Sequence, residues 1–134
     1  MKRTFMLMLI MAMALGAVAC AGAAPKPEET LGYNVHMYHQ HLRWGRYYEA
    51  SLFLNDADRE HFMGRQEELG DDWRVVEVEV RSIRMTKPNE EAQAEVVIAW
   101  TRSPDVTVHK DKVIEVWRLV AGRWQIVERE VEPL

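Results

Sequence analysis

The run Lys112–Val131, KVIEVWRLVAGRWQIVEREV, decides the fold because apolar residues alternate with other residues on both sides of a short break. Alternation with a period of two is typical of a strand with one buried face. The break, Ala121-Gly122, has the length of a two-residue hairpin turn. Such a hairpin predicts three cross-strand pairs, which are Leu119 with Trp124, Trp117 with Ile126, and Glu115 with Glu128.

The same period extends to four strand-like runs in the second half of the chain. They are WRVVEVEVRSIRM at 73–85, AQAEVVIAWTR at 92–102, VTVHKDKVIEVWRLV at 106–120 and RWQIVEREV at 123–131. Turn-forming residues separate them at 87–90, 103–105 and 121–122. Short connections of this kind favour antiparallel neighbours, so the runs predict a four-stranded meander.

Upstream of the strands the period is helical. Steps of 100° predict a helix over about residues 31–49 whose apolar stripe contains Tyr33, Met37, His41, Trp44, Tyr48 and Leu52. His36, His39, Arg43 and Arg46 fall on another, polar side. A second helix is predicted from the capping residues at 55–58 to Gly70. Helices followed by strands in one small domain, residues 31–134, indicate an α+β fold with helices packed on the sheet.

The first 20 residues, MKRTFMLMLIMAMALGAVAC, have the layout of a bacterial export signal, with two basic residues, an uncharged run and small residues before Cys20. The apolar run is short for a membrane-spanning helix. Small residues followed at once by cysteine resemble the lipobox of bacterial lipoproteins, although Ala17 stands where that family usually has Leu. The resemblance implies a signal peptide at 1–19 and diacylation of Cys20 with palmitate-type chains. Residues 20–30 would then be the lipidated cysteine and a flexible tether.

Two further implications follow for location. Ala21 after the cysteine implies sorting to the outer membrane of a Gram-negative envelope, with the domain facing the periplasm. The alternative is an ordinary secreted protein cut after Ala19 or Ala23, with a lone thiol. The net charge of −4 and the lack of a basic patch argue against nucleic acid and anionic lipid head groups as partners of the protein.

The order of the motifs resembles the nuclear transport factor 2-like superfamily, which includes ketosteroid isomerase and SnoaL-type cyclases. The resemblance rests on LRWGRYYEASLFLNDADREHF at 42–62, the strand beginning Trp73-Arg74-Val75-Val76, and EVWRL…GRWQI at 115–126. It implies a curved antiparallel sheet wrapped around helices, with a conical cavity. A cystatin-like layout is the alternative. In enzymes of the superfamily, a pocket Asp or His acts as base, with Tyr or Asp donors beside it.

Eight side chains are candidates for lining such a pocket: His41, Trp44, Tyr48, His109, Asp111, Glu115, Trp117 and Glu128. If buried, the Glu115/Glu128 pair would hold a proton between like charges. On a solvated rim it would have no such role. His109 and Asp111 share the parity of Trp117, so they are either a base with an orienting acid or an exposed strand end. His41 is a core histidine or a pocket donor, and the aromatic residues are core or cavity wall.

No cofactor or metal is expected. The sequence has no Gly-rich phosphate loop, nucleophile-elbow Ser or Cys-based metal site, and His36 and His39 lack a third ligand at fixed spacing. We therefore expect a lipid-anchored envelope protein that serves as a non-enzymatic binding or assembly module, with a second copy or another envelope protein as possible partner. The alternatives are an isomerase- or cyclase-like enzyme and a carrier of a small hydrophobic molecule.

Overall fold

The computed structural model describes residues 22–134 and has the predicted α+β architecture. Helices come first, as α2 (Pro27–Arg43), α3 (Tyr47–Ser51), α4 (Asp56–Leu69) and the short 3-10 turn η1 (Gly70–Asp72). The strands follow as β1 (Trp73–Lys87), β2 (Glu91–Arg102), β3 (Asp105–Val120) and β4 (Arg123–Pro133). The predicted signal peptide and Cys20 lie outside the described residues.

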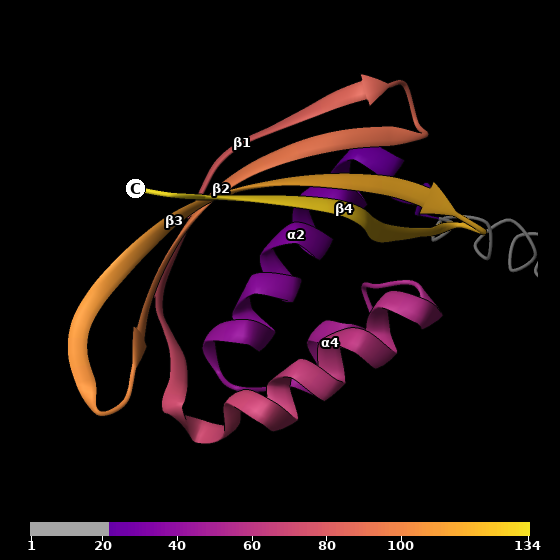
Figure 1. Ribbon diagram of the computed structural model, residues 1–134. Coiled ribbons are helices and arrows are strands. Elements are labelled where there is room, and N and C mark those ends of the chain that lie inside the picture. The colour runs from indigo at the N-terminus through magenta and orange to yellow at the C-terminus, as the bar shows by residue number, and fades with distance from the viewer. Residues whose placement is uncertain (1–21) are drawn as a thin grey trace, which may run out of the picture.

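The four strands form one antiparallel sheet in the order β1-β2-β3-β4, which confirms the predicted meander. The β3–β4 turn is the expected two-residue hairpin. Ala121 and Gly122 both have positive φ values, of 50° and 76°, as the right-handed twist of the flanking strands requires. In Figure 1 the sheet twists strongly and curves around α2, while α4 runs along the open side of the curve.

The core lies between α2 and the inner face of the sheet. Leu31, Val35 and Leu42 supply the helix side of it, and Trp117 of β3, with no exposed area, lies at its centre. Full burial of side chains of this size is the main favourable term in folding. The Trp124 indole N–H donates to the carbonyl oxygen of Pro27 at 2.9 Å, which attaches the start of α2 to β4.

The buried face of α2 is opposite to the predicted one. Tyr33, Trp44 and Tyr48 keep 64%, 68% and 64% of their surface exposed. The prediction followed the aromatic residues, whereas the aliphatic residues Leu31, Val35 and Leu42 mark the core side. The predicted helix over 31–49 is also two helices, because the chain turns at Gly45 with a φ of 66° and α3 starts at Tyr47. A stripe drawn through this break joins residues that share no helix face.

Helix α2 begins at Pro27, four residues before the predicted start. Proline at the first helical position is favourable because its missing N–H would have no partner there, and Glu28 and Glu29 complement the positive end of the helix dipole. Residues 22–26 are in neither helix nor strand. The first described helix therefore begins inside the predicted tether of residues 20–30. In residues 22–134, no helix has both the length and the apolar character needed to cross a membrane.

Candidate functional site

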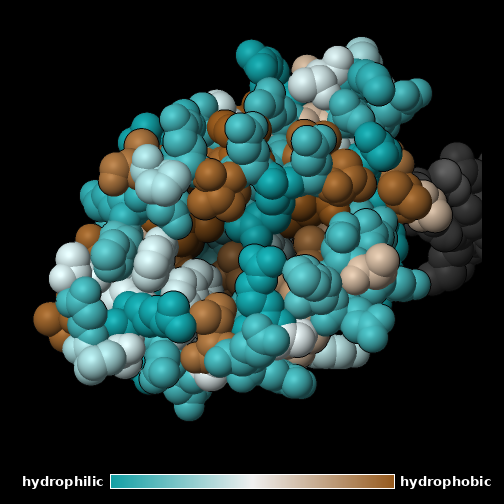
Figure 2. All heavy atoms as spheres, in the orientation of Figure 1, coloured by the Kyte–Doolittle hydropathy of each residue, from teal (hydrophilic) through white to brown (hydrophobic). Residues whose placement is uncertain are grey.

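A cavity of about 510 Å³ separates α4 from the inner face of the sheet. Its apolar wall consists of Leu42, Leu54, Phe62, Leu69, Trp73, Ile98, Trp100, Val113, Ile126, Val127 and Val131. In Figure 2 this face of the molecule is hollowed between the strands and α4, and hydrophobic atoms line the recess while hydrophilic ones surround it. Pockets of this size and mostly apolar lining are typical of sites for small molecules.

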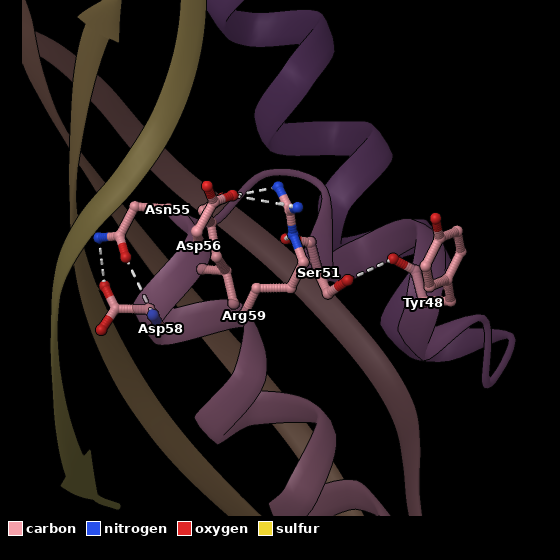
Figure 3. Close-up of polar contacts among 7 residues, drawn as sticks. Tyr48, Ser51, Asn55, Asp56, Asp58 and Arg59 are labelled. Atoms are coloured by element: carbon pink, nitrogen blue, oxygen red, sulfur yellow. Dashed lines mark hydrogen bonds and ion pairs between the residues drawn. The ribbon is translucent and has the colours of Figure 1, made fainter.

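The cavity exists because α4 does not fill the space beneath it. None of the residues of α4 is buried. Helix α4 is held from its N-terminal end, where the Asn55 side chain accepts a hydrogen bond from the Asp58 N–H at 2.9 Å (Figure 3). Capping of this kind stabilises a helix by about 1 kcal/mol.

The corner before α4 is attached to both neighbouring elements. Arg59 pairs with Asp56 at 3.2 Å, as Figure 3 shows, and its guanidinium donates to the carbonyl oxygens of Ser51 and Leu54. The chain just before the cap is joined to β4, because the Ile126 N–H donates to the Phe53 carbonyl at 2.8 Å. The position of α4 over the sheet therefore depends on this corner more than on packing along the helix.

Asp111 lines one end of the cavity, and its carboxylate accepts a hydrogen bond from the Trp100 indole N–H at 2.7 Å. His109 does not line the cavity. Its ring stacks on Trp100 with centroids 4.5 Å apart, and the residue is exposed. The structure thus places Asp111 inside and His109 outside, and Asp111 binds Trp100 instead of orienting His109.

The predicted Glu115/Glu128 pair is wrong. A bulge between Val116 and Trp117 shifts the register by one residue, so Glu115 lies opposite Arg129 and Glu128 lies opposite Val116. The pairs nearer the turn, Trp117 with Ile126 and Leu119 with Trp124, are as predicted. The bulge matters physically because it brings a cation to a buried carboxylate, where the straight register would have brought a second carboxylate. Glu128 is exposed and lines the cavity.

Glu115 is fully buried and bonds to two side chains of the core. The His39 Nε2 lies 3.0 Å from its Oε1 and 3.2 Å from its Oε2, and the Trp117 indole N–H donates to Oε2 at 3.1 Å. Burial alone would raise the pKa of the Glu115 carboxyl, but the charge and hydrogen bond of His39, together with Arg129 and Trp117, hold that pKa below its usual value. Glu115 is therefore an ionised carboxylate in a dry site.

Arg129 connects this buried group to the cavity. Its Nε lies 3.7 Å from Glu115 Oε1, its guanidinium carbon lies 5.9 Å from the centre of the Tyr38 ring, and the residue lines the cavity. The side chain keeps 31% of its surface exposed. Burial alone would lower the pKa of Arg129, but Tyr38 and Glu115 outweigh it and raise that pKa. The guanidinium is a permanent positive charge in the cavity wall.

His39 and Arg129 were not predicted as members of a site. The helical period placed His39 on the polar side of the helix, whereas His39 is 1% exposed and faces the sheet. Glu115 was the residue in the sequence that could have indicated these two partners, because a carboxylate on the inner face of a strand needs a partner of opposite charge. Arg129 could be found by asking which residue of β4 supplies that partner.

The other candidates lie away from the cavity. Trp44 and Tyr48 are exposed on the outer side of α2 and α3, and Trp117 lies in the core. His41 is half-buried and lines a separate depression beside Phe53. Over residues 22–134, no three His, Cys, Asp or Glu side chains come together as metal ligands.

No protein-family model matches the chain, and no curated protein matches it either. Solved structures share its fold. A domain of unknown function with a cystatin-like fold from Nostoc punctiforme has 13% identity and a TM-score of 0.62 over 77% of this chain and 76% of that one. A second Nostoc punctiforme protein of unknown function, also cystatin-like, has 12% identity and a TM-score of 0.54 over 78% of this chain and 88% of that one.

A third structure is described as a candidate Ca/calmodulin-dependent kinase II association domain from Exiguobacterium sibiricum. It has 12% identity and a TM-score of 0.61 over 84% of this chain and 98% of that one. At these identities the likeness establishes the fold alone, which is the cystatin-like α+β arrangement.

Proposed function

We propose that this chain is a lipid-anchored protein of the bacterial envelope, with a nuclear transport factor 2-like domain that binds a small, mostly apolar molecule in the cavity under α4. The observation that carries the proposal is the cavity of about 510 Å³, whose walls are aliphatic and aromatic side chains. Binding of an apolar ligand is favourable at such a surface, because it removes apolar area of both the wall and the ligand from water. This makes a non-enzymatic binding module the function that the geometry supports best.

The anchor in this proposal is Cys20, supported by the lipobox-like sequence around it. Two or more acyl chains hold a protein stably on a bilayer, whereas one does so only marginally. Only residues 21–26 separate Cys20 from α2, and such a segment reaches about 3 Å per residue. The binding domain would therefore stay close to the membrane, with the periplasmic face of the outer membrane as the proposed location.

The anchor is tested by producing the full chain in bacteria fed an alkyne-bearing fatty acid, beside a Cys20→Ser variant. We expect label on the natural chain and none on the variant. An unlabelled natural chain, or a mass that shows a free thiol at Cys20, would contradict the anchor and leave the cavity proposal standing.

The cavity is tested with a soluble form, residues 20–134 with Cys20→Ser, whose folding is checked by a cooperative thermal transition. We expect the neutral fluorophore phenylnaphthylamine to bind this protein, and Val131→Trp to block the binding because Val131 lines the cavity. Val108→Trp is the matched control, because Val108 lies outside the cavity and is similarly exposed, 51% against 54% for Val131. Equal binding by both variants would contradict the cavity as the site.

One observation favours a second candidate, proton-transfer catalysis. Asp111 is a carboxylate inside the cavity, fixed by the Trp100 indole at 2.7 Å, and a held carboxylate is what removal of a proton next to a carbonyl requires. The test is deuterium exchange at the α-carbon of a panel of ketones in heavy water, followed by NMR. Exchange above the rate in buffer that is lost in Asp111→Asn would support an isomerase-like enzyme, and its absence across the panel would leave the binding module.

A further inference from the structure

We propose that Arg129 makes the cavity selective for amphiphiles that carry a single carboxylate head group on an apolar body. This inference rests on the proposed binding function and names the ligand class for the same cavity. It is carried by the way the Arg129 side chain is held and by what surrounds its free donors.

The guanidinium of Arg129 is fixed from behind. Glu115 contacts its Nε side at 3.7 Å, and the Tyr38 ring lies against its guanidinium carbon at 5.9 Å. Glu115 is in turn held by His39 and Trp117. A guanidinium placed in this way loses little freedom when it binds a ligand, so Glu115 acts as its positioning residue.

The donors of Arg129 are not used up by the protein. Across residues 22–134, Glu115 is the one acidic residue within ion-pair distance of Arg129, and no hydrogen bond from its Nη atoms is formed. Arg129 lines the cavity, so its free N–H groups are available to a molecule there. A guanidinium fork matches the two oxygens of a carboxylate.

The surroundings limit the ligand to one negative charge. Asp58 and Glu128 also line the cavity, as does Arg65, and the two carboxylates would repel a head group of higher charge. Asp111 is four positions from Glu115 on β3, which corresponds to about 13 Å along the strand, so it does not compete for the head group at Arg129. The apolar wall beside Arg129, formed by Val113, Val131 and Ile126, fits a hydrocarbon body.

The test compares two probes that differ only in the head group, dodecanoate and dodecanol, each below the concentration at which it aggregates. Both displace phenylnaphthylamine from the soluble form near neutral pH, and their dissociation constants are compared. Charged hydrogen bonds predict tighter binding of dodecanoate by about tenfold or more. Arg129→Gln should remove this preference, and Arg129→Lys, which keeps the charge but loses the fork, should keep only part of it.

Arg118→Gln is the matched control, because Arg118 lies outside the cavity and pairs with Glu91 at 2.9 Å. It should keep the preference. Equal binding of both probes by the natural sequence, or a preference that survives Arg129→Gln, would overturn this inference and leave the apolar cavity intact. Failure of both probes to bind would overturn the proposed function with it. If Arg129→Gln does not fold, the natural sequence and Arg129→Lys still decide the question.

Discussion

The substitution Glu115→Gln tests the buried cluster most directly because it keeps the shape of the side chain and removes its charge. The amide oxygen of glutamine still accepts the Trp117 indole N–H, so packing and that hydrogen bond are retained. What is lost is the negative charge that faces His39 at 3.0 Å, with 1% and 0% of the two side chains exposed. Any change in stability therefore reports the loss of that charge beside His39 and Arg129.

We expect a loss of about 3–5 kcal/mol in the free energy of unfolding near neutral pH, the range found when one partner of a buried pair is removed. Most of it belongs to His39, because the Arg129 side chain is 31% exposed and solvent screens its share. For a domain of this size the loss lowers the melting temperature by more than about 10 °C. The measurement is urea denaturation followed by tryptophan fluorescence.

The matched control is Glu132→Gln, which removes a carboxylate from the same sheet. Glu132 pairs with Lys112 and is 62% exposed, so we expect a change below about 1 kcal/mol. The double variant His39→Leu with Glu115→Leu should be more stable than Glu115→Gln, because it removes both polar groups of the buried pair, and Arg129, which loses Glu115 in either variant, is 31% exposed. A loss for Glu115→Gln no larger than that for Glu132→Gln would refute the reasoning.

Acid gives the experiment a second readout. Burial alone would raise the pKa of Glu115, but His39, Arg129 and Trp117 together hold it below its ordinary value of 4.5 in the folded protein. A carboxyl group whose pKa is lowered by folding stabilises the folded protein fully at pH values above its ordinary pKa. This stabilisation is lost as the pH falls through the pKa that the group has in the folded protein. The difference between the natural sequence and Glu115→Gln should therefore shrink as the pH falls below about 4.5.

Three other predictions concern stability. Burial raises the pKa of Tyr38 to about 12, against the effect of Arg129. The contribution of Tyr38 to the free energy of unfolding is therefore complete below its ordinary pKa of 10.0 and is lost as the pH rises through about 12. In urea denaturation at a series of alkaline pH values, Tyr38→Phe should lose less stability than the natural sequence. Asn55→Ala should lower the free energy of unfolding in urea by about 1 kcal/mol, because it removes the cap of α4. By calorimetry, Trp117→Ala should lower the free energy of unfolding by about 3–5 kcal/mol, because Trp117 is fully buried. Trp44→Ala should lower it by under about 1 kcal/mol, because Trp44 is 68% exposed. Equal losses would contradict the assignment of Trp117 to the core and of Trp44 to the surface.

The strand half of the fold follows from local sequence to a large degree. Alternation, the spacing of turn residues and Ala121-Gly122 were enough to predict the sheet and the pairs nearest the hairpin, and the structure confirms them. These features succeed because a strand with one buried face leaves a period of two in the residues themselves. The cystatin-like arrangement was predicted only as an alternative within the resemblance.

The helix face and the site could not be predicted in the same way. Three exposed aromatic residues outweighed the aliphatic stripe of α2 in the helical wheel, although single exposed aromatic residues are common on protein surfaces. The bulge before Trp117 has no glycine or other marker in the sequence. It places Glu115 opposite Arg129, and the contact of Glu115 with His39 exists only once the sheet has packed on α2.

The arrangement of α4 links the stability of the fold to the proposed binding. The helix has no buried residue, while its first turn is capped and the chain just before it is bonded to β4. Segments with little buried apolar surface open at a lower free energy than the core does. An apolar ligand in the cavity would add contacts on the sheet-facing side of α4, so binding should slow hydrogen exchange in α4 more than in β3. This coupling depends on the cavity between α4 and the sheet. If the side chains of α4 already filled that cavity, a ligand could add no contacts that stabilise the helix.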